Sequence, residues 1–436
     1  MDGVKVVFAA FLTLSPFVPA VDSAFGAEVG FDAGADLRVR QELLQNVPGC
    51  PGGGLVRTPC GRFTDHLRVR PRVWGEFRLD AGEIGRFRLY TRIADEFRWN
   101  IEPYKNATAW PGELILDNLF LEGRGLFDGL VDFRIGRQDL YGYCRLDHVF
   151  VDGTPGDGSR TTYTDMAALT FNVDEANTLD VFGLYDFDNV DDLRWGYDHQ
   201  RFASLSARFP DGHGDQDDFG YGAVWTSKNV RSLPWQVFAM QKQSLHVGEY
   251  RNRTELVGVK LMPKWDEDFS GTVEAMSELN AEWSGYADIT WKPVRDGVKP
   301  FVNLGYRFLS KEWDPMWARA VNDSEMFLYG THNGVAWWSN MQFLKLTAGL
   351  DFGEFHALTV STGPMFAAEA DGVGGGDGFF KGELSQVKYG FPLIVPEEGG
   401  RLEAHAHVLF EYFNPGDYYE SRRGAWFFRW QVEFRF

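Results

Sequence analysis

The sequence predicts an all-β fold: a transmembrane, antiparallel, up-and-down β-barrel of about eighteen strands behind an N-terminal signal peptide. Three observations support this fold class. Apolar and polar residues alternate over runs of 10 to 14 residues, aromatic residues make up 16% of the 436 residues, and 49 residues are Gly. Runs of that length suit strands that cross a bilayer at a tilt, whereas strands of soluble sandwiches are about five or six residues long.

The N-terminus has the features of an export signal. Lys5 provides a short basic region, residues 6–20 are mostly apolar, and Ala24 and Gly26 are small residues at the positions that a signal peptidase reads. We expect cleavage after Gly26, so that residues 1–26 are removed and residues 27–436 form one barrel domain. No later stretch of 18 apolar residues occurs, which excludes a membrane-spanning helix after the signal.

The strand signal is clearest near the two ends of the exported chain. Along residues 67–79, an apolar face alternates with a face that carries Arg68, Arg70 and Arg72. Along the last strand, aromatic residues from Trp426 to Phe436 point one way and polar residues point the other. A terminal aromatic residue on such a strand resembles the signature that the barrel-assembly machinery reads. The resemblance implies this machinery and outer-membrane lipid as partners.

The strand count follows from parity. Both chain ends of a bacterial barrel lie on the side of the short turns, so the number of strands is even. Counting residues 202–209 as a strand gives nineteen and places the long segment 311–340 on the wrong side. We therefore assign residues 202–209 to an external loop, which gives eighteen strands.

The polar face of each strand is expected to line the lumen because the apolar face must contact lipid. The candidate pore-lining and anion-binding residues are Arg38, Arg40, Arg68, Arg70, Arg72, Arg88, Arg92, Arg134, Arg307, Lys345 and Arg429. Arginine suits an anionic solute because its planar guanidinium binds carboxylate or phosphate through two hydrogen bonds.

A braced lumen is the alternative interpretation of the same residues. Between residues 66 and 140 there are 12 basic and 12 acidic side chains, among them Glu76 and Glu122. Arginines that pair with luminal carboxylates would stiffen the wall without making the pore strongly selective. The run from Arg68 to Arg72 has no acid on its face before Glu76, which favours a local positive patch.

Other features narrow the function classes. The formal net charge of −19 disfavours nucleic acid as a partner. Cys50 and Cys60 flank a Pro/Gly-rich segment and are expected to form a disulfide, which leaves Cys144 without a predicted disulfide partner.

His405 and His407 share a strand face without a third ligand, so we expect no metal site. No motif of a hydrolase, a phosphate-binding loop or a dinucleotide site occurs, and we expect no catalytic residues and no cofactor.

Two segments resemble the alginate-export family of outer-membrane porins. One is Ile-Gly-Arg-Gln-Asp-Leu at residues 135–140, within an arginine-alternating region at residues 67–146, and the other is Gly-Tyr-Arg-Phe-Leu-Ser at residues 305–310. Lys311 and Glu312 then depart from the family's Gly-Asp. The resemblance implies an eighteen-stranded channel that passes a uronate polyanion.

The sequence thus favours a passive outer-membrane channel for an anionic solute, with export of an anionic polysaccharide such as alginate as the leading interpretation. A general nutrient porin with a braced, weakly selective lumen is the alternative in the same class. An outer-membrane barrel hydrolase is the alternative from another class, because a Ser/His pair on adjacent strands leaves no linear motif.

Overall fold

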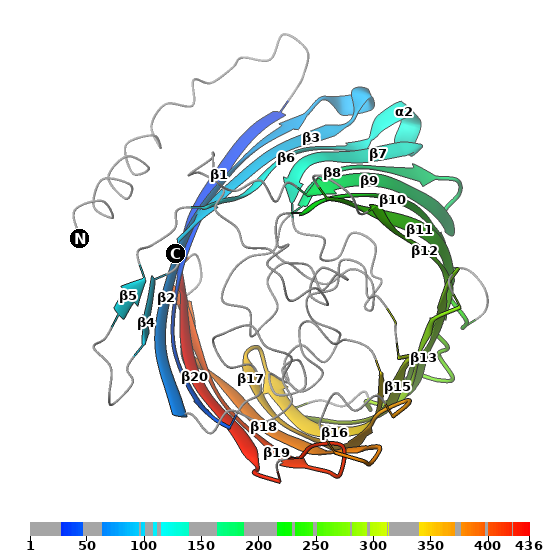
Figure 1. The fold of residues 1–436 in the computed structure, drawn as a ribbon. Coiled ribbons are helices and arrows are strands. Elements are labelled where there is room, and N and C mark those ends of the chain that lie inside the picture. The colour runs from blue at the N-terminus through cyan, green and yellow to red at the C-terminus, as the bar shows by residue number, and fades with distance from the viewer. Residues whose placement is uncertain are drawn as a thin grey trace.

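The computed structural model shows a closed antiparallel β-barrel (Figure 1). It describes residues 28–46, 63–95, 97–100, 108–110, 115–138, 164–186, 216–228, 232–246, 251–279, 281–293, 297–311, 313, 340–370, 376–396, 400–420 and 422–436. The predicted signal peptide and the three cysteines, Cys50, Cys60 and Cys144, lie outside these residues. Among the described residues, no helix is long and apolar enough to cross a membrane.

Twenty strands and two short helical turns follow one another along the described chain. They are β1 (Glu28–Gln45), β2 (Phe63–Asp80), η1 (Gly82–Ile84), β3 (Arg86–Ala94), β4 (Phe97–Asn100), β5 (Thr108–Trp110), β6 (Ile115–Gly125), α2 (Leu126–Gly129), β7 (Val131–Gln138), β8 (Thr164–Asn172), β9 (Asn177–Asp186), β10 (Gln216–Ser227), β11 (Trp235–His246), β12 (Arg251–Leu261), β13 (Phe269–Glu278), β14 (Trp283–Trp291), β15 (Lys299–Leu309), β16 (Met341–Gly353), β17 (His356–Phe366), β18 (Phe380–Ile394), β19 (Glu403–Pro415) and β20 (Ala425–Arg435).

Eighteen of these strands form the wall, as the parity argument predicts. Each wall strand pairs with the next in antiparallel fashion, and β1 pairs with both β2 and β20, which closes the barrel. Strand β9 pairs directly with β10, so no wall strand lies between them. Residues 202–209, which fall in that connection, are outside the described part of the chain.

The two remaining strands, β4 and β5, are an extension of the wall. Strand β2 is longer than β3, and β4 pairs with the part of β2 that β3 does not reach. Strand β5 pairs with β4, and the two protrude beside β2 outside the ring of the other strands (Figure 1).

The two faces of the wall differ in polarity. Large apolar side chains on the outward face are exposed, as a lipid-facing surface requires. They include Phe31, Leu89, Leu121, Ile135, Val181, Val257, Leu304, Val360 and Phe410. Inward residues of the same strands include buried charged groups such as Arg40, Glu42 and Arg429.

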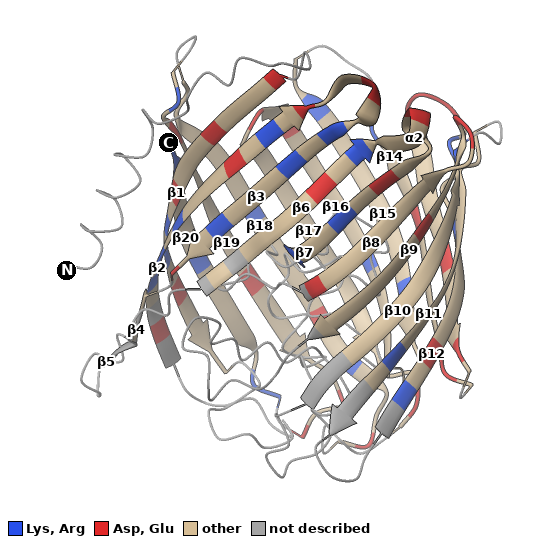
Figure 2. Cartoon of the chain, turned by 90° about the horizontal axis from the view of Figure 1, so that it is seen from above, with Lys and Arg blue, Asp and Glu red and all other residues tan. Residues whose placement is uncertain are grey.

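Short turns connect the strands at one end of the barrel, which we call the short-turn end. The segments between β2 and β3, β6 and β7, and β16 and β17 have only a few residues each. The chain enters β1 at this end, because Glu28 pairs with Asp80 next to the turn between β2 and β3, and it leaves β20 there because β20 runs antiparallel to β1. Figure 2 shows α2 at this rim.

Candidate functional site in the barrel lumen

The basic residues chosen from the sequence all lie on inward positions of their strands. Arg38 and Arg40 are on β1, Arg68, Arg70 and Arg72 on β2, Arg88 and Arg92 on β3, Arg134 on β7, Arg307 on β15, Lys345 on β16 and Arg429 on β20. Because β1, β2, β3, β6 and β7 are neighbours, most of these residues occupy one continuous wall. Figure 2 shows that acidic residues share the strands of this wall.

Glu42 gathers three of the arginines at the seam where β20 meets β1 and β2. The Arg429 side chain donates to Glu42 Oε1 through Nη2 at 2.8 Å and through Nε at 3.1 Å. Arg68 Nε lies 3.1 Å and Arg40 Nε 3.4 Å from the Glu42 carboxylate. Glu42 is only 2% exposed, so one buried carboxylate compensates guanidiniums from three strands.

A cavity of about 540 Å³ opens on the lumen next to this seam, and we call it the seam cavity. Its described lining carries seven basic side chains against one carboxylate, that of Glu433. The basic residues are Arg38, Arg70, Arg72, Arg92, Lys388, Arg429 and Arg435. Arg72 is also held by Asp36, to which its Nε donates at 2.8 Å. The cavity therefore has a strong excess of positive charge.

Aromatic and small residues also line the seam cavity. Phe355, in the turn between β16 and β17, stacks on His405 with ring centroids 4.3 Å apart and planes 6° apart. The Arg435 guanidinium lies 5.4 Å from the Phe355 ring centroid. Ala357 and Gly390, which are small, line the cavity as well.

Sequence reasoning missed several of these cavity residues as site residues. Lys388 and Arg435 lie on inward positions that alternation along β18 and β20 would have identified. Phe355 is a turn residue with φ of 56°, and no sequence pattern marks it as inward. His405 and His407, which share one strand face, also line the cavity. Among the described residues, no three possible ligands cluster to hold a metal ion.

Arg307 and Lys345 lie away from the other predicted residues. Arg307 is 1% exposed, and its guanidinium lies 5.3 Å from the ring centroid of Tyr286 on the neighbouring strand β14. Lys345, on β16, pairs with Gly305 on the neighbouring strand β15. These two groups belong to another sector of the wall and do not join the arginines of β1 to β7.

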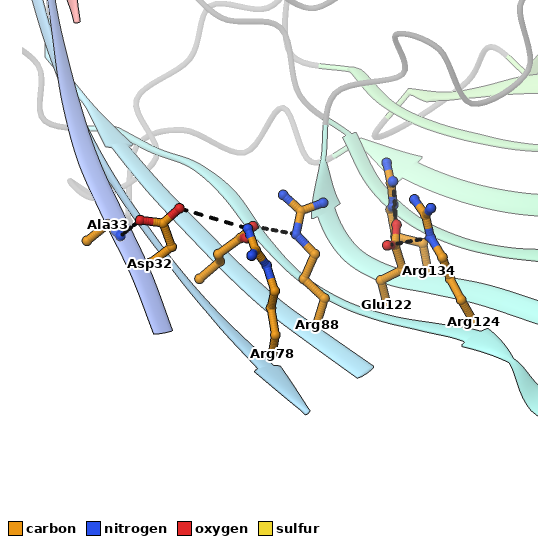
Figure 3. Close-up of polar contacts among 8 residues, drawn as sticks. Asp32, Ala33, Arg78, Arg88, Glu122, Arg124 and Arg134 are labelled. Atoms are coloured by element: carbon orange, nitrogen blue, oxygen red, sulfur yellow. Dashed lines mark hydrogen bonds and ion pairs between the residues drawn. The ribbon is translucent and has the colours of Figure 1, made fainter. Parts of the chain in front are cut away.

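A second cluster of charges lies near the short-turn end of β2, β3, β6 and β7 (Figure 3). Arg78 and Arg88 both contact the Glu76 carboxylate, and Arg124 and Arg134 both contact that of Glu122. We call these two groups the paired triads. In these triads, Arg88 and Arg134 pair with luminal carboxylates, which is the braced arrangement.

Comparison with known proteins identifies the fold. No protein-family model and no curated protein sequence matches the chain. Solved structures similar to it include *Pseudomonas aeruginosa* OpdK with vanillate (12% identity, TM-score 0.57, 93% of this chain and 100% of that chain). *Acinetobacter baumannii* OccAB1 has 12% identity and a TM-score of 0.55 over 93% of this chain and 97% of that chain. Pseudomonas aeruginosa OccK5 (OpdH) has 10% identity and a TM-score of 0.53 over 93% of this chain and 98% of that chain.

The fold and the surface together define where the chain resides. A closed barrel of eighteen strands removes all sheet edges, and its exposed outward side chains are apolar. Such a barrel satisfies its backbone hydrogen bonds within the wall and can therefore span the hydrocarbon core of a membrane. The chain is a barrel protein of the cell outer membrane.

Proposed function

We propose that the chain is a passive outer-membrane channel for anionic solutes. The observation that carries this proposal is the seam cavity, in which seven basic side chains and one carboxylate line about 540 Å³ of luminal space. A charged wall with low-dielectric surroundings concentrates ions of the opposite sign and raises the barrier for ions of its own sign. Because salt screens charges over about 8 Å at 0.15 M, the effect requires a solute to pass close to the arginines.

An anionic polysaccharide such as alginate is the solute that we favour. The support is the resemblance of residues 135–140 and 305–310 to the alginate-export porins, together with the arginine chemistry of the wall. Uronates carry one carboxylate on each ring, and guanidiniums bind such groups through paired hydrogen bonds. A passive pore has no direction of its own, so export would follow the gradient of polymer made inside the cell.

A porin for small nutrients is the second candidate. The bracing of Arg68, Arg72, Arg88 and Arg134 by carboxylates favours it, because braced arginines contribute less to selectivity. The similar structure of OpdK was solved with vanillate, a small aromatic carboxylate. Under this alternative, the seam cavity would take a single small anion.

Conductance in planar bilayers tests the proposal and separates the two candidates. Under a KCl gradient, the purified protein should give a reversal potential that favours chloride. Uronate oligomers should block the current more strongly than neutral oligosaccharides of equal length. If vanillate blocks and uronate oligomers do not, the small-solute porin is the better description.

A triple substitution with a matched control locates the selectivity. Changing Arg38, Arg70 and Arg92 to Gln should move the reversal potential toward potassium. Arg137→Gln is the control, because Arg137 pairs with Asp165 on the outward face and does not line the seam cavity. A wild-type channel that prefers potassium would contradict the proposal.

A further inference from the structure

The paired triads repeat one sequence spacing in two successive hairpins. Glu76 is followed by arginines two and twelve residues later, Arg78 and Arg88. Glu122 is followed at the same two intervals by Arg124 and Arg134. In each case, the first arginine is on the strand of the glutamate, and the second is on the strand that returns from the short turn.

The geometry of the two triads is also alike. Arg88 Nε donates to Glu76 Oε2 at 2.6 Å, and Arg78 contacts Oε1. Arg134 donates through Nε at 2.8 Å to Glu122 Oε2, and Arg124 Nε lies 2.8 Å from Oε1. Each carboxylate thus uses one oxygen for each of its two arginines.

Exposure differs sharply between the two kinds of residue. The side chains of Glu76 and Glu122 are 4% and 7% exposed, whereas those of Arg78 and Arg124 are 60% and 56% exposed. A solute near this wall therefore meets the exposed guanidiniums of Arg78 and Arg124, with the two triad carboxylates behind them. The triads hold four arginines against two glutamates, and Asp32, 3.9 Å from Arg78, places a further carboxylate beside them.

An aromatic side chain joins the triads. The Phe120 ring lies between the two returning arginines, with the guanidinium of Arg134 4.7 Å and that of Arg88 5.5 Å from its centroid. A cavity of about 610 Å³ lies beside the triads, and Glu76, Arg78, Arg88, Glu122 and Arg124 line it. Arg86, Glu28 and Asp80 also line it, so its charged lining is four basic and four acidic side chains. The size is within the range of small-molecule sites, about 300 to 1,000 Å³.

We infer that the paired triads form a carboxylate-exchange site near the short-turn mouth of the pore. A solute carboxylate binds the guanidiniums of the triads, and Glu76 and Glu122 compete with it for the same groups. The two glutamates are positioning residues: they orient the arginines and keep the solute from binding too tightly. This inference rests on the proposed passage of anionic solutes and adds a site at which the wall binds and releases them.

The reason for such competition is the requirement that a channel release what it binds. Conduction needs binding that is favourable enough for entry and weak enough for exit. Hydrogen bonds between guanidinium and carboxylate are among the strong ones in proteins, and more so away from bulk water. An internal carboxylate that takes over the guanidinium as the solute leaves lowers the cost of that step.

Single-channel recording of block by uronate oligomers tests the inference in the purified full chain. Glu76→Gln and Glu122→Gln each remove a competitor while keeping the side-chain size. Each should lengthen the blocked dwell time, by about ten-fold, as the loss of a charged hydrogen-bond competitor would do. Glu122→Asp keeps the charge and should stay near the wild-type dwell time.

A double variant tests the role of the exposed arginines. Arg78→Gln combined with Arg124→Gln should shorten the dwell time, while each glutamate keeps its other arginine. Asp165→Asn is the matched control, because it breaks a comparable pair with Arg137 on the outward face. It should leave the dwell time unchanged.

The outcomes separate this inference from the proposed function. If the glutamates only brace the wall, their change to Gln lowers the unfolding midpoint and leaves the dwell time as it was, which overturns the inference. An unchanged dwell time in the arginine double variant also overturns it. A wild-type reversal potential that favours potassium contradicts the proposed function instead.

Discussion

The backbone of Phe436 exchanges two hydrogen bonds with that of Ala35. The Phe436 N–H donates to the Ala35 carbonyl oxygen at 2.9 Å, and the Ala35 N–H donates to the Phe436 carbonyl oxygen at 3.3 Å. The last residue of the chain is therefore a paired residue of the seam between β20 and β1. Its side chain is 49% exposed, on the outward face that it shares with Phe434.

Deletion of Phe436 should reduce the amount of folded barrel in the outer membrane. It removes both hydrogen bonds and the terminal aromatic group that resembles an assembly signature. The measurement is the heat-modifiable fraction on a gel after membrane isolation. Phe436→Trp keeps the backbone pair and an aromatic ring and should fold normally. Normal folding of the deletion would leave the terminal residue without a role in assembly.

Glu42→Gln should destabilise the seam. Glu42 is buried and holds Arg40, Arg68 and Arg429, so its neutralisation removes a negative charge that three guanidiniums share. Loss of one partner of a buried ion pair costs about 3 to 5 kcal/mol. Urea unfolding of the refolded protein in detergent would measure the difference. Glu403→Gln is the control, since Glu403 pairs with Arg435 at a more exposed position, and it should cost much less.

Gly136→Ala should destabilise the barrel through the backbone of β7. Gly136 has φ of 124°, and a Cβ there would lie 2.2 Å from the carbonyl oxygen of Leu119 on β6. A strained backbone of this kind costs about 1 to 3 kcal/mol, and the close contact adds to it. Gly183→Ala on β9 is the matched control, because the nearest atom to its Cβ would be 3.9 Å away. Equal unfolding midpoints for the two variants would contradict this explanation.

Alternation along the sequence, together with the even strand count of a barrel whose two chain ends lie on one side, was sufficient to predict the wall. Alternation gave the inward side of Arg68, Arg70 and Arg72, because a strand that separates lipid from lumen must place apolar and polar residues on opposite faces, and parity gave the number of strands. Because local periodicity determines which face of a strand is polar, one sequence is enough to predict it.

The partners of the luminal residues could not be predicted in the same way. Glu42 and Arg429 are 387 positions apart, and they meet only because the barrel closes between β1 and β20. The seam cavity depends on the same closure, and Phe355 enters it from a turn. Which arginine is braced and which lines a cavity is a property of register across strands, and strand periodicity does not contain it.

The pH dependence of stability should include a contribution from Asp174, in the short turn between β8 and β9. A hydrogen bond from the Asn177 side chain, with others from the backbone N–H groups of Ala176 and Asn177, holds the pKa of Asp174 below its ordinary value. A carboxyl whose pKa is depressed by folding adds stability above its unfolded pKa, about 3.9, and this stability is lost as the pH falls through the lower, folded pKa. Asp174→Ala should therefore lower the unfolding midpoint at pH 7, and the difference from wild type should shrink as the pH is brought below about 4. Asn177→Ala removes the strongest donor and should reduce the pH dependence in the same direction. A difference between wild type and Asp174→Ala that is the same at both pH values would show that the ionised carboxylate does not stabilise this turn.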